Sequence, residues 1–101
     1  MARTVSKLSA ATVKNASRRG YYSDGGGLYL QVGATGAKSW VFRYKVGGKL
    51  YEMGLGALHT VGLAEARTRA RQCREHRLDG LDPLAVRRAA RMQAMLDVAK
   101  G

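Results

Sequence analysis

Residues 24–32 read DGGGLYLQV and residues 38–46 read KSWVFRYKV, and both runs alternate in the manner of half-buried β-strands. The three glycines predict a tight turn before the first strand, because glycine adopts a positive φ without steric cost. In that strand the two leucines and Val32 face one side of a sheet, and Tyr29 and Gln31 face the other.

The second run continues the same pattern. Trp40, Phe42 and Tyr44 share one face, and Arg43 and Lys45 lie on the opposite face. The paired glycines that follow are a hairpin signal, and a third alternating run comes after them. The sequence therefore predicts a three-stranded antiparallel meander over residues 28–32, 39–46 and 49–55.

Beyond this meander the apolar period becomes helical. Ala66, Ala70 and Cys73 recur at spacings of four and three residues. This spacing predicts a helix over residues 63–78, whose small side chains allow a close approach to the aromatic face of the sheet.

Two further helices are predicted at the ends of the chain. Ser9 is a suitable N-cap for a short helix that reaches Asn15, because its hydroxyl accepts a hydrogen bond from a free backbone N–H. Asp82 followed by Pro83 begins another helix that extends to about Val98. The expected fold class is thus α+β: a three-stranded antiparallel β-sheet packed against an α-helix, with a short N-terminal helix and a C-terminal connector helix.

Charge is the most unusual feature of the composition. The 101 residues are enough for one small domain, and they carry a formal net charge of +11 with a pI near 10.6. Such a charge favours a nucleic-acid partner, with membrane-surface binding as the competing interpretation. No apolar run has the length of a membrane span or of a signal peptide, so a cytoplasmic protein is expected.

The sequence offers no catalytic constellation. Its lone Cys73 is expected to be a small buried hydrophobe, and His59 and His76 are far apart without carboxylates at ligand spacing. The glycines at 25–27 are followed by neither a Gly-Lys-Ser/Thr run nor a helix, which argues against a phosphate-binding loop. No metal, no cofactor and no catalytic residue is therefore predicted.

The polar face of the sheet is the candidate binding surface, since a small sheet fits the major groove of DNA. Two of its candidate DNA contacts, Lys38 and Lys49, lie at strand ends, where phosphate contacts are expected rather than base contacts. The candidate residues are Tyr29, Gln31, Lys38, Ser39, Arg43, Lys45 and Lys49. An ordinary solvated sheet face explains the pattern equally well. Leu50 and Glu52 argue against a fully basic face, and Glu52 is placed to pair with Arg43 across the sheet.

The aromatic face has two interpretations as well. A row of Trp40, Phe42 and Tyr44 resembles a platform for stacking single-stranded bases. The core interpretation is favoured, because a domain of this size must bury its few large aromatic side chains in order to fold.

The chain resembles the N-terminal arm-type DNA-binding domain of prophage and genomic-island integrases, a branch of the tyrosine recombinases. The resemblance is carried by several short motifs, which occur in the same order as in that family. The resemblance covers roughly residues 8 to 88. The matching motifs are YSDGGGLYLQV at 22–32, GAKSWVFRY at 36–44, MGLG at 53–56, LAEAR at 63–67 and GLDP at 80–83, with Leu8-Ser9 and Val13-Lys14 before them.

The resemblance implies a sheet that lies in the major groove of arm-type repeats near an attachment site and supports integration and excision of a mobile element. It implies an arm-type DNA-binding domain over residues 1–81, and a connector helix over 82–101 leading to core-binding and catalytic regions that this chain lacks. The implied partners are double-stranded DNA and other integrase protomers. From another class of function, the alternative is a protein-interaction module that bridges protomers or binds an accessory factor through Met92 and Met95.

Overall fold

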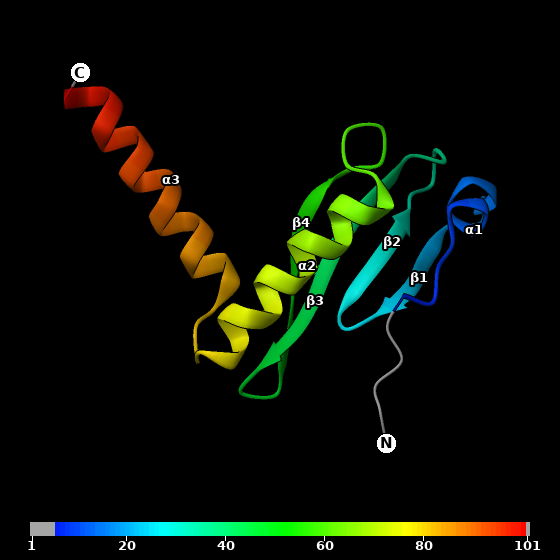
Figure 1. Cartoon of the computed structure of the whole chain (residues 1–101), viewed down its shortest axis with the longest axis horizontal. Coiled ribbons are helices and arrows are strands. Elements are labelled where there is room, and N and C mark those ends of the chain that lie inside the picture. Colours follow the sequence, from blue (N-terminus) through cyan, green and yellow to red (C-terminus); the bar gives the residue numbers. More distant parts are fainter. Residues whose placement is uncertain (1–5, 101) are drawn as a thin grey trace.

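A computed structural model describes residues 6–100 of the chain as an α+β domain (Figure 1). Four strands and three helices follow one another along these residues. In chain order they are α1 (Ala10–Asn15), β1 (Gly20–Gly25), β2 (Leu28–Val32), β3 (Lys38–Val46), β4 (Lys49–Ala57), α2 (Leu63–Leu78) and α3 (Pro83–Lys100).

The four strands form one antiparallel sheet in the order β1-β2-β3-β4. The prediction of an α+β fold with an antiparallel sheet is confirmed, but the expected number of three strands is wrong. β1 pairs with β2, Tyr22 opposite Leu30 and Ser23 opposite Tyr29, and its register shifts before Gly25. The turn into β2 is consequently made by Gly26 and Gly27 alone, both with positive φ.

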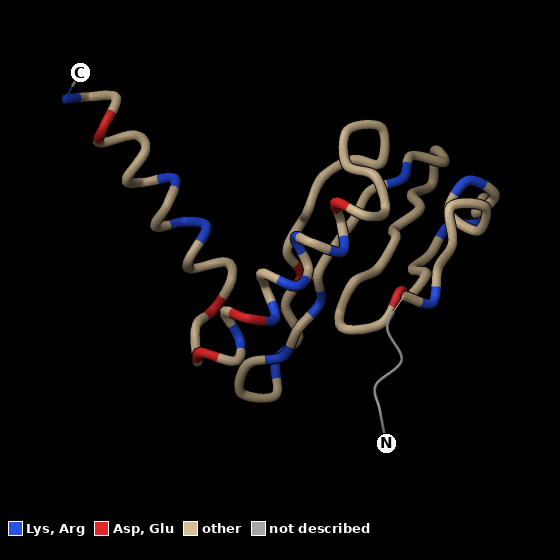
Figure 2. Tube along the Cα trace, viewed as in Figure 1, with Lys and Arg blue, Asp and Glu red and all other residues tan. Residues whose placement is uncertain are grey.

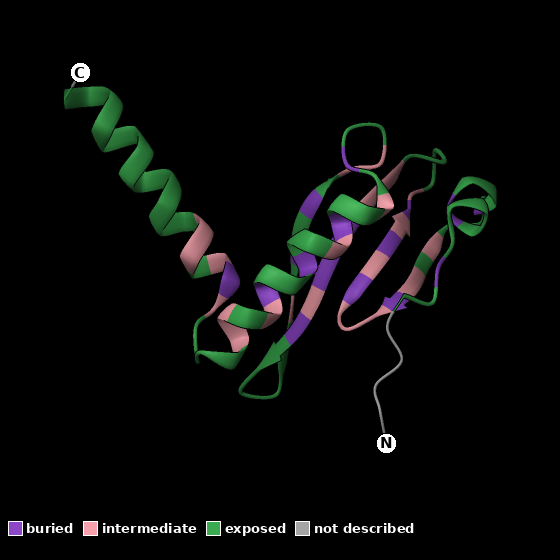
Figure 3. Ribbon diagram, in the orientation of Figure 1, coloured by how far each residue is buried: buried purple, intermediate pink, exposed green. Residues whose placement is uncertain are grey.

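The core lies between the sheet and α2, which crosses one face of it (Figures 1 and 3). Ala66, Ala70 and Cys73 of α2 are buried, as their spacing predicted. The side chains of Trp40, Phe42 and Tyr44 are buried on the same side. The prediction that they form the core is confirmed, and they are not available as a platform for stacking bases.

The three helices are arranged differently from the prediction, in which only the helix over residues 63–78 packs against the sheet. The N-terminal segment also contributes to the core, through the buried side chains of Leu8, Val13 and Ala16. Ser9 caps α1 as predicted, because its hydroxyl accepts a hydrogen bond from the backbone N–H of Thr12. The short helix and the residues beside it are thus part of the packed core.

An ion pair between the buried Asp24 and the partly exposed Arg67 holds this N-terminal segment against β1 and α2. The Asp24 carboxylate accepts hydrogen bonds from Nε and Nη2 of Arg67, both at 2.9 Å, and from the backbone N–H of Leu8 at 2.8 Å. Arg67 Nη2 also donates to the carbonyl of Leu8. Asp24, which directly precedes the predicted glycine turn, is therefore a buried tether between three segments of the chain.

Helix α3 extends away from the sheet, and only its first turns pack against the rest of the domain (Figures 1 and 3). The Tyr44 hydroxyl donates a hydrogen bond to the Asp82 carboxylate, which also accepts from the backbone N–H of Leu84 at 3.1 Å. Asp82 is thus the N-cap of α3, as predicted, and it anchors the start of that helix to β3.

This anchor is expected to weaken at high pH. Burial and the hydrogen bond to Asp82 raise the pKa of Tyr44 to about 12, above the value near 10 of an unfolded tyrosine. A raised pKa means that this contribution to stability is complete below about pH 10 and is lost as the pH rises toward about 12. The free energy of unfolding, measured with urea, should fall further between about pH 9 and about pH 11.5 in the wild type than in Tyr44→Phe. An equal fall in the free energy of unfolding of both proteins would contradict the attribution of this pH dependence to Tyr44.

Candidate nucleic-acid interface

The open face is the side of the sheet opposite α2. The strand register places Tyr29 beside Val41, Gln31 beside Ser39, and Arg43 beside Glu52. Together with their neighbours these side chains define the open face, made of Tyr21, Ser23, Tyr29, Gln31, Ser39, Val41, Arg43, Lys45, Leu50 and Glu52. Five of the seven predicted contact residues thus share one surface: Tyr29, Gln31, Ser39, Arg43 and Lys45.

The other two predicted contacts lie elsewhere. Lys38 pairs with Val32 on the helix side of the sheet, and its Nζ donates to the carbonyls of Val13 and Lys14 at 2.9 and 2.8 Å. It therefore binds the last turn of α1, where a cation is favoured by the helix dipole. Lys49 is exposed at the β3–β4 hairpin, next to the ring of Tyr51.

Arg43 occupies the centre of the open face. Its guanidinium carbon lies 4.6 Å from the ring centre of Tyr21 and 5.3 Å from that of Tyr29. Its Nε lies 3.2 Å from Oε1 of Glu52, so the cross-strand pair expected from the sequence is confirmed. The Nε–H is buried and is not aligned for a hydrogen bond, so this contact is an ion pair.

Tyr21 completes this cluster, and sequence reasoning left it out. Its ring meets that of Tyr29 edge to face with centres 6.2 Å apart, and its hydroxyl accepts a hydrogen bond from Nε2 of Gln31 at 3.4 Å. Hydrogen bonding to Glu52, followed by burial, raises the pKa of Tyr21. Recognising Gly20–Gly25 as a strand would have placed Tyr21 beside Gln31 and on this face.

The arginines of α2 lie on the other side of the sheet and bind other parts of the domain. Arg74 donates to the carbonyl of Gly26, and Arg77 donates to those of Lys45 and Leu81. Arg69 and Arg71 pair with glutamates one turn away along the same helix. Figure 2 shows basic residues along α2, β3 and α3, with acidic residues among them on α2, at the junction of α2 and α3, and on α3.

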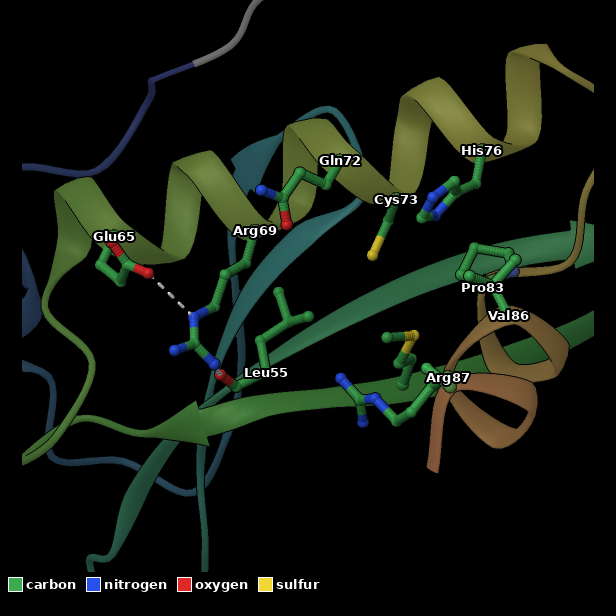
Figure 4. A pocket seen from close by; sticks show the side chains of 11 residues that line it. Leu55, Glu65, Arg69, Gln72, Cys73, His76, Pro83, Val86 and Arg87 are labelled. Atoms are coloured by element: carbon green, nitrogen blue, oxygen red, sulfur yellow. Dashed lines mark hydrogen bonds and ion pairs between the residues drawn. The ribbon is translucent and has the colours of Figure 1, made fainter. Parts of the chain in front are cut away.

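A groove of about 310 Å³ lies where α2, β4 and the start of α3 meet (Figure 4). Met53, Leu55 and Cys73 give it apolar walls, and Arg69 and Arg87 stand at its sides. Burial raises the pKa of the Cys73 thiol, and burial together with the charge of Arg91 lowers the pKa of Arg87. Over residues 6–100, no three His, Cys, Asp or Glu side chains gather where they could hold a metal ion.

Fold and surface together define a small α+β domain that presents one open sheet face carrying arginine, lysine, amide and hydroxyl groups. The chain belongs to the Arm DNA-binding domain family, whose model matches residues 4–90. In the part of the chain that the structure describes, no helix is both long enough and apolar enough to span a bilayer.

Curated relatives of this chain are integrases. It is 37% identical over 87 residues to the integrase of Shigella phage Sf6 and, equally, to the prophage integrase IntS of Escherichia coli K12. It is 35% identical over 92 residues to the integrase of Enterobacteria phage P4. Each alignment covers 86% of this chain but only 21–22% of the relative, so the chain spans about a fifth of the length of these proteins.

Proposed function

We propose that this chain is the DNA-binding module of a site-specific recombinase of the tyrosine recombinase class. In this proposal its open face enters the major groove of arm-type repeats at an attachment site. The observation that carries the proposal is the gathering of Tyr29, Gln31, Ser39, Arg43 and Lys45 on one face of the sheet. Family membership and the integrase relatives point to the same partner.

The dimensions of the sheet suit such a partner. Adjacent strands lie about 4.8 Å apart, so the two central strands with their side chains fit a major groove about 12 Å wide. Arg43 and Gln31 carry the groups that read base edges, since arginine donates to guanine and glutamine pairs with adenine. Lys45 and Lys49 lie toward the β3–β4 hairpin, where phosphates at the groove wall are the natural contact.

The division of the parent protein is part of the same proposal. Residues 1–81 form the arm-type domain, and the helix that follows connects it to core-binding and catalytic regions. This chain supplies DNA recognition and no catalytic residue, and the recombination chemistry belongs to the remainder of a cytoplasmic enzyme.

The open face can be tested against a control arginine on α3. Arg43→Ala should weaken binding to a labelled attachment-site duplex by about 5- to 150-fold, because an arginine–base contact contributes about 1–3 kcal/mol. Arg91→Ala, which removes an exposed arginine of α3, should have a small effect. Fluorescence-anisotropy titrations at several salt concentrations measure both, and log affinity should fall linearly with log salt. Equal, small effects of the two substitutions would overturn the proposal.

A second candidate function rests on α3. Met92, Met95 and Leu96 of α3 are 56%, 68% and 49% exposed, so three large apolar side chains lie close together on the surface of one helix. They suit a contact with another integrase protomer or an accessory protein. A salt-insensitive association that is lost in a Met92→Glu/Met95→Glu variant would favour this function over DNA binding.

A further inference from the structure

The open face carries an acidic residue beside its arginine, which a surface built only to grip phosphates would not need. Glu52 of β4 lies directly opposite Arg43 of β3, and the two side chains form an ion pair at 3.2 Å. About a third of each side chain is exposed, 37% for Glu52 and 27% for Arg43. Both groups can therefore be reached by a ligand that approaches the open face.

The surroundings hold this pair in place. The rings of Tyr21 and Tyr29 pack against the guanidinium of Arg43, which limits its movement across the sheet. The Nε of Arg43 is buried, so the terminal Nη groups are the donors left for a ligand. The pair thus presents donors and a carboxylate acceptor side by side on neighbouring strands.

This arrangement matches one edge of DNA. In the major groove a G·C pair shows two acceptors on guanine, N7 and O6, next to a donor on cytosine, the N4 amino group. Arginine is the usual partner of the guanine acceptors, and a glutamate carboxylate accepts from the cytosine amino group. When adenine stands in the place of guanine, its N6 amino donor replaces the O6 acceptor that an arginine would use. Thymine then offers a methyl group and an O4 acceptor in place of the cytosine amino group, and neither donates a hydrogen bond to a carboxylate.

We propose that Arg43 and Glu52 together read a single G·C base pair, with Glu52 as the residue that sets specificity by accepting a hydrogen bond from cytosine N4. The inference rests on the proposed function, because it assumes that the open face lies in the major groove. It explains why the open face keeps a carboxylate beside its arginine, while Lys45 and Lys49 lie nearer the hairpin, where phosphate contacts are expected.

Selection from a randomised duplex pool tests the inference with the full chain. The wild type should enrich a motif containing one fixed G·C pair. Glu52→Gln keeps the shape of the side chain but adds a donor, so it should lower discrimination at that pair by about tenfold and leave the other positions of the motif unchanged. Glu52→Asp keeps the acceptor and should retain the preference for G·C with weaker binding.

Glu65→Gln is the matched control. It also removes a carboxylate paired with an arginine, but on α2 and away from the open face, so it should leave the motif unchanged. Circular dichroism establishes that each variant is folded. Failure of the wild type to enrich any motif would overturn the proposed function. An identical motif for wild type and Glu52→Gln, with only a uniform gain in affinity, would overturn the role of Glu52 alone.

Discussion

Replacing Asp24 with alanine is expected to lower the free energy of unfolding by about 3 kcal/mol. The carboxylate is buried and binds both Arg67 and the backbone of Leu8, so its removal leaves a cation and an amide N–H without their partner. Breaking a buried ion pair from one side costs about 3–5 kcal/mol, and the lower figure applies because Arg67 is 33% exposed. For a domain of this size the melting temperature should fall by about 10–20 °C.

Urea denaturation followed by circular dichroism measures this loss. Glu75→Ala provides the control, because Glu75 pairs with Arg71 on the exposed side of α2, where such a pair contributes less than about 0.5 kcal/mol. A loss below about 1 kcal/mol in Asp24→Ala would mean that the tether is not a major determinant of stability.

The second large effect is expected at Trp40, which is fully buried between the sheet and α2. Its indole Nε1 donates a hydrogen bond to the carbonyl of Val61 at 2.7 Å, so the ring both fills the core and holds the loop before α2. Trp40→Ala should cost about 3–5 kcal/mol, because the cavity left behind cannot be filled by its neighbours. For a small domain, a loss of this size leaves little of the native state.

Trp40→Phe separates the two contributions, since it retains most of the ring and removes the hydrogen bond. The expected loss is smaller than for alanine, and thermal unfolding of both variants measures the difference. Leu50→Ala, a half-exposed leucine on the open face, should change stability by no more than about 0.5 kcal/mol. Comparable losses in Leu50→Ala and Trp40→Ala would contradict the location of the core.

The alternation of residues along β2, β3 and β4 was sufficient to predict which face of the sheet most side chains occupy. It did not predict that Val41 of the open face is buried or that Val46 is exposed. It predicts little about β1, because GYYSDG contains two glycines and an aspartate and shows no clean alternation. The missing strand accounts for the omission of Tyr21, whose position on the open face follows only from its pairing with Gln31.

The roles of individual charged residues were harder to predict, because each depends on contacts between segments distant in the chain. Lys38 was expected at a phosphate, yet its ammonium group binds carbonyls of α1, 24 and 25 residues away. Asp24 directly precedes the glycines of a turn, yet the residue that pairs with its carboxylate, Arg67, lies 43 residues away along the chain. Local patterns define the strands and faces, but they do not indicate which charges the fold uses internally.

The burial of Cys73 has a practical consequence for the study of this domain. Its side chain is 3% exposed and burial raises the pKa of its thiol, so little reactive thiolate is available at neutral pH. A cysteine introduced on an exposed loop will therefore react with maleimide dyes in preference to the native one. Fluorescent labels can be attached at chosen positions without first removing Cys73 from the core.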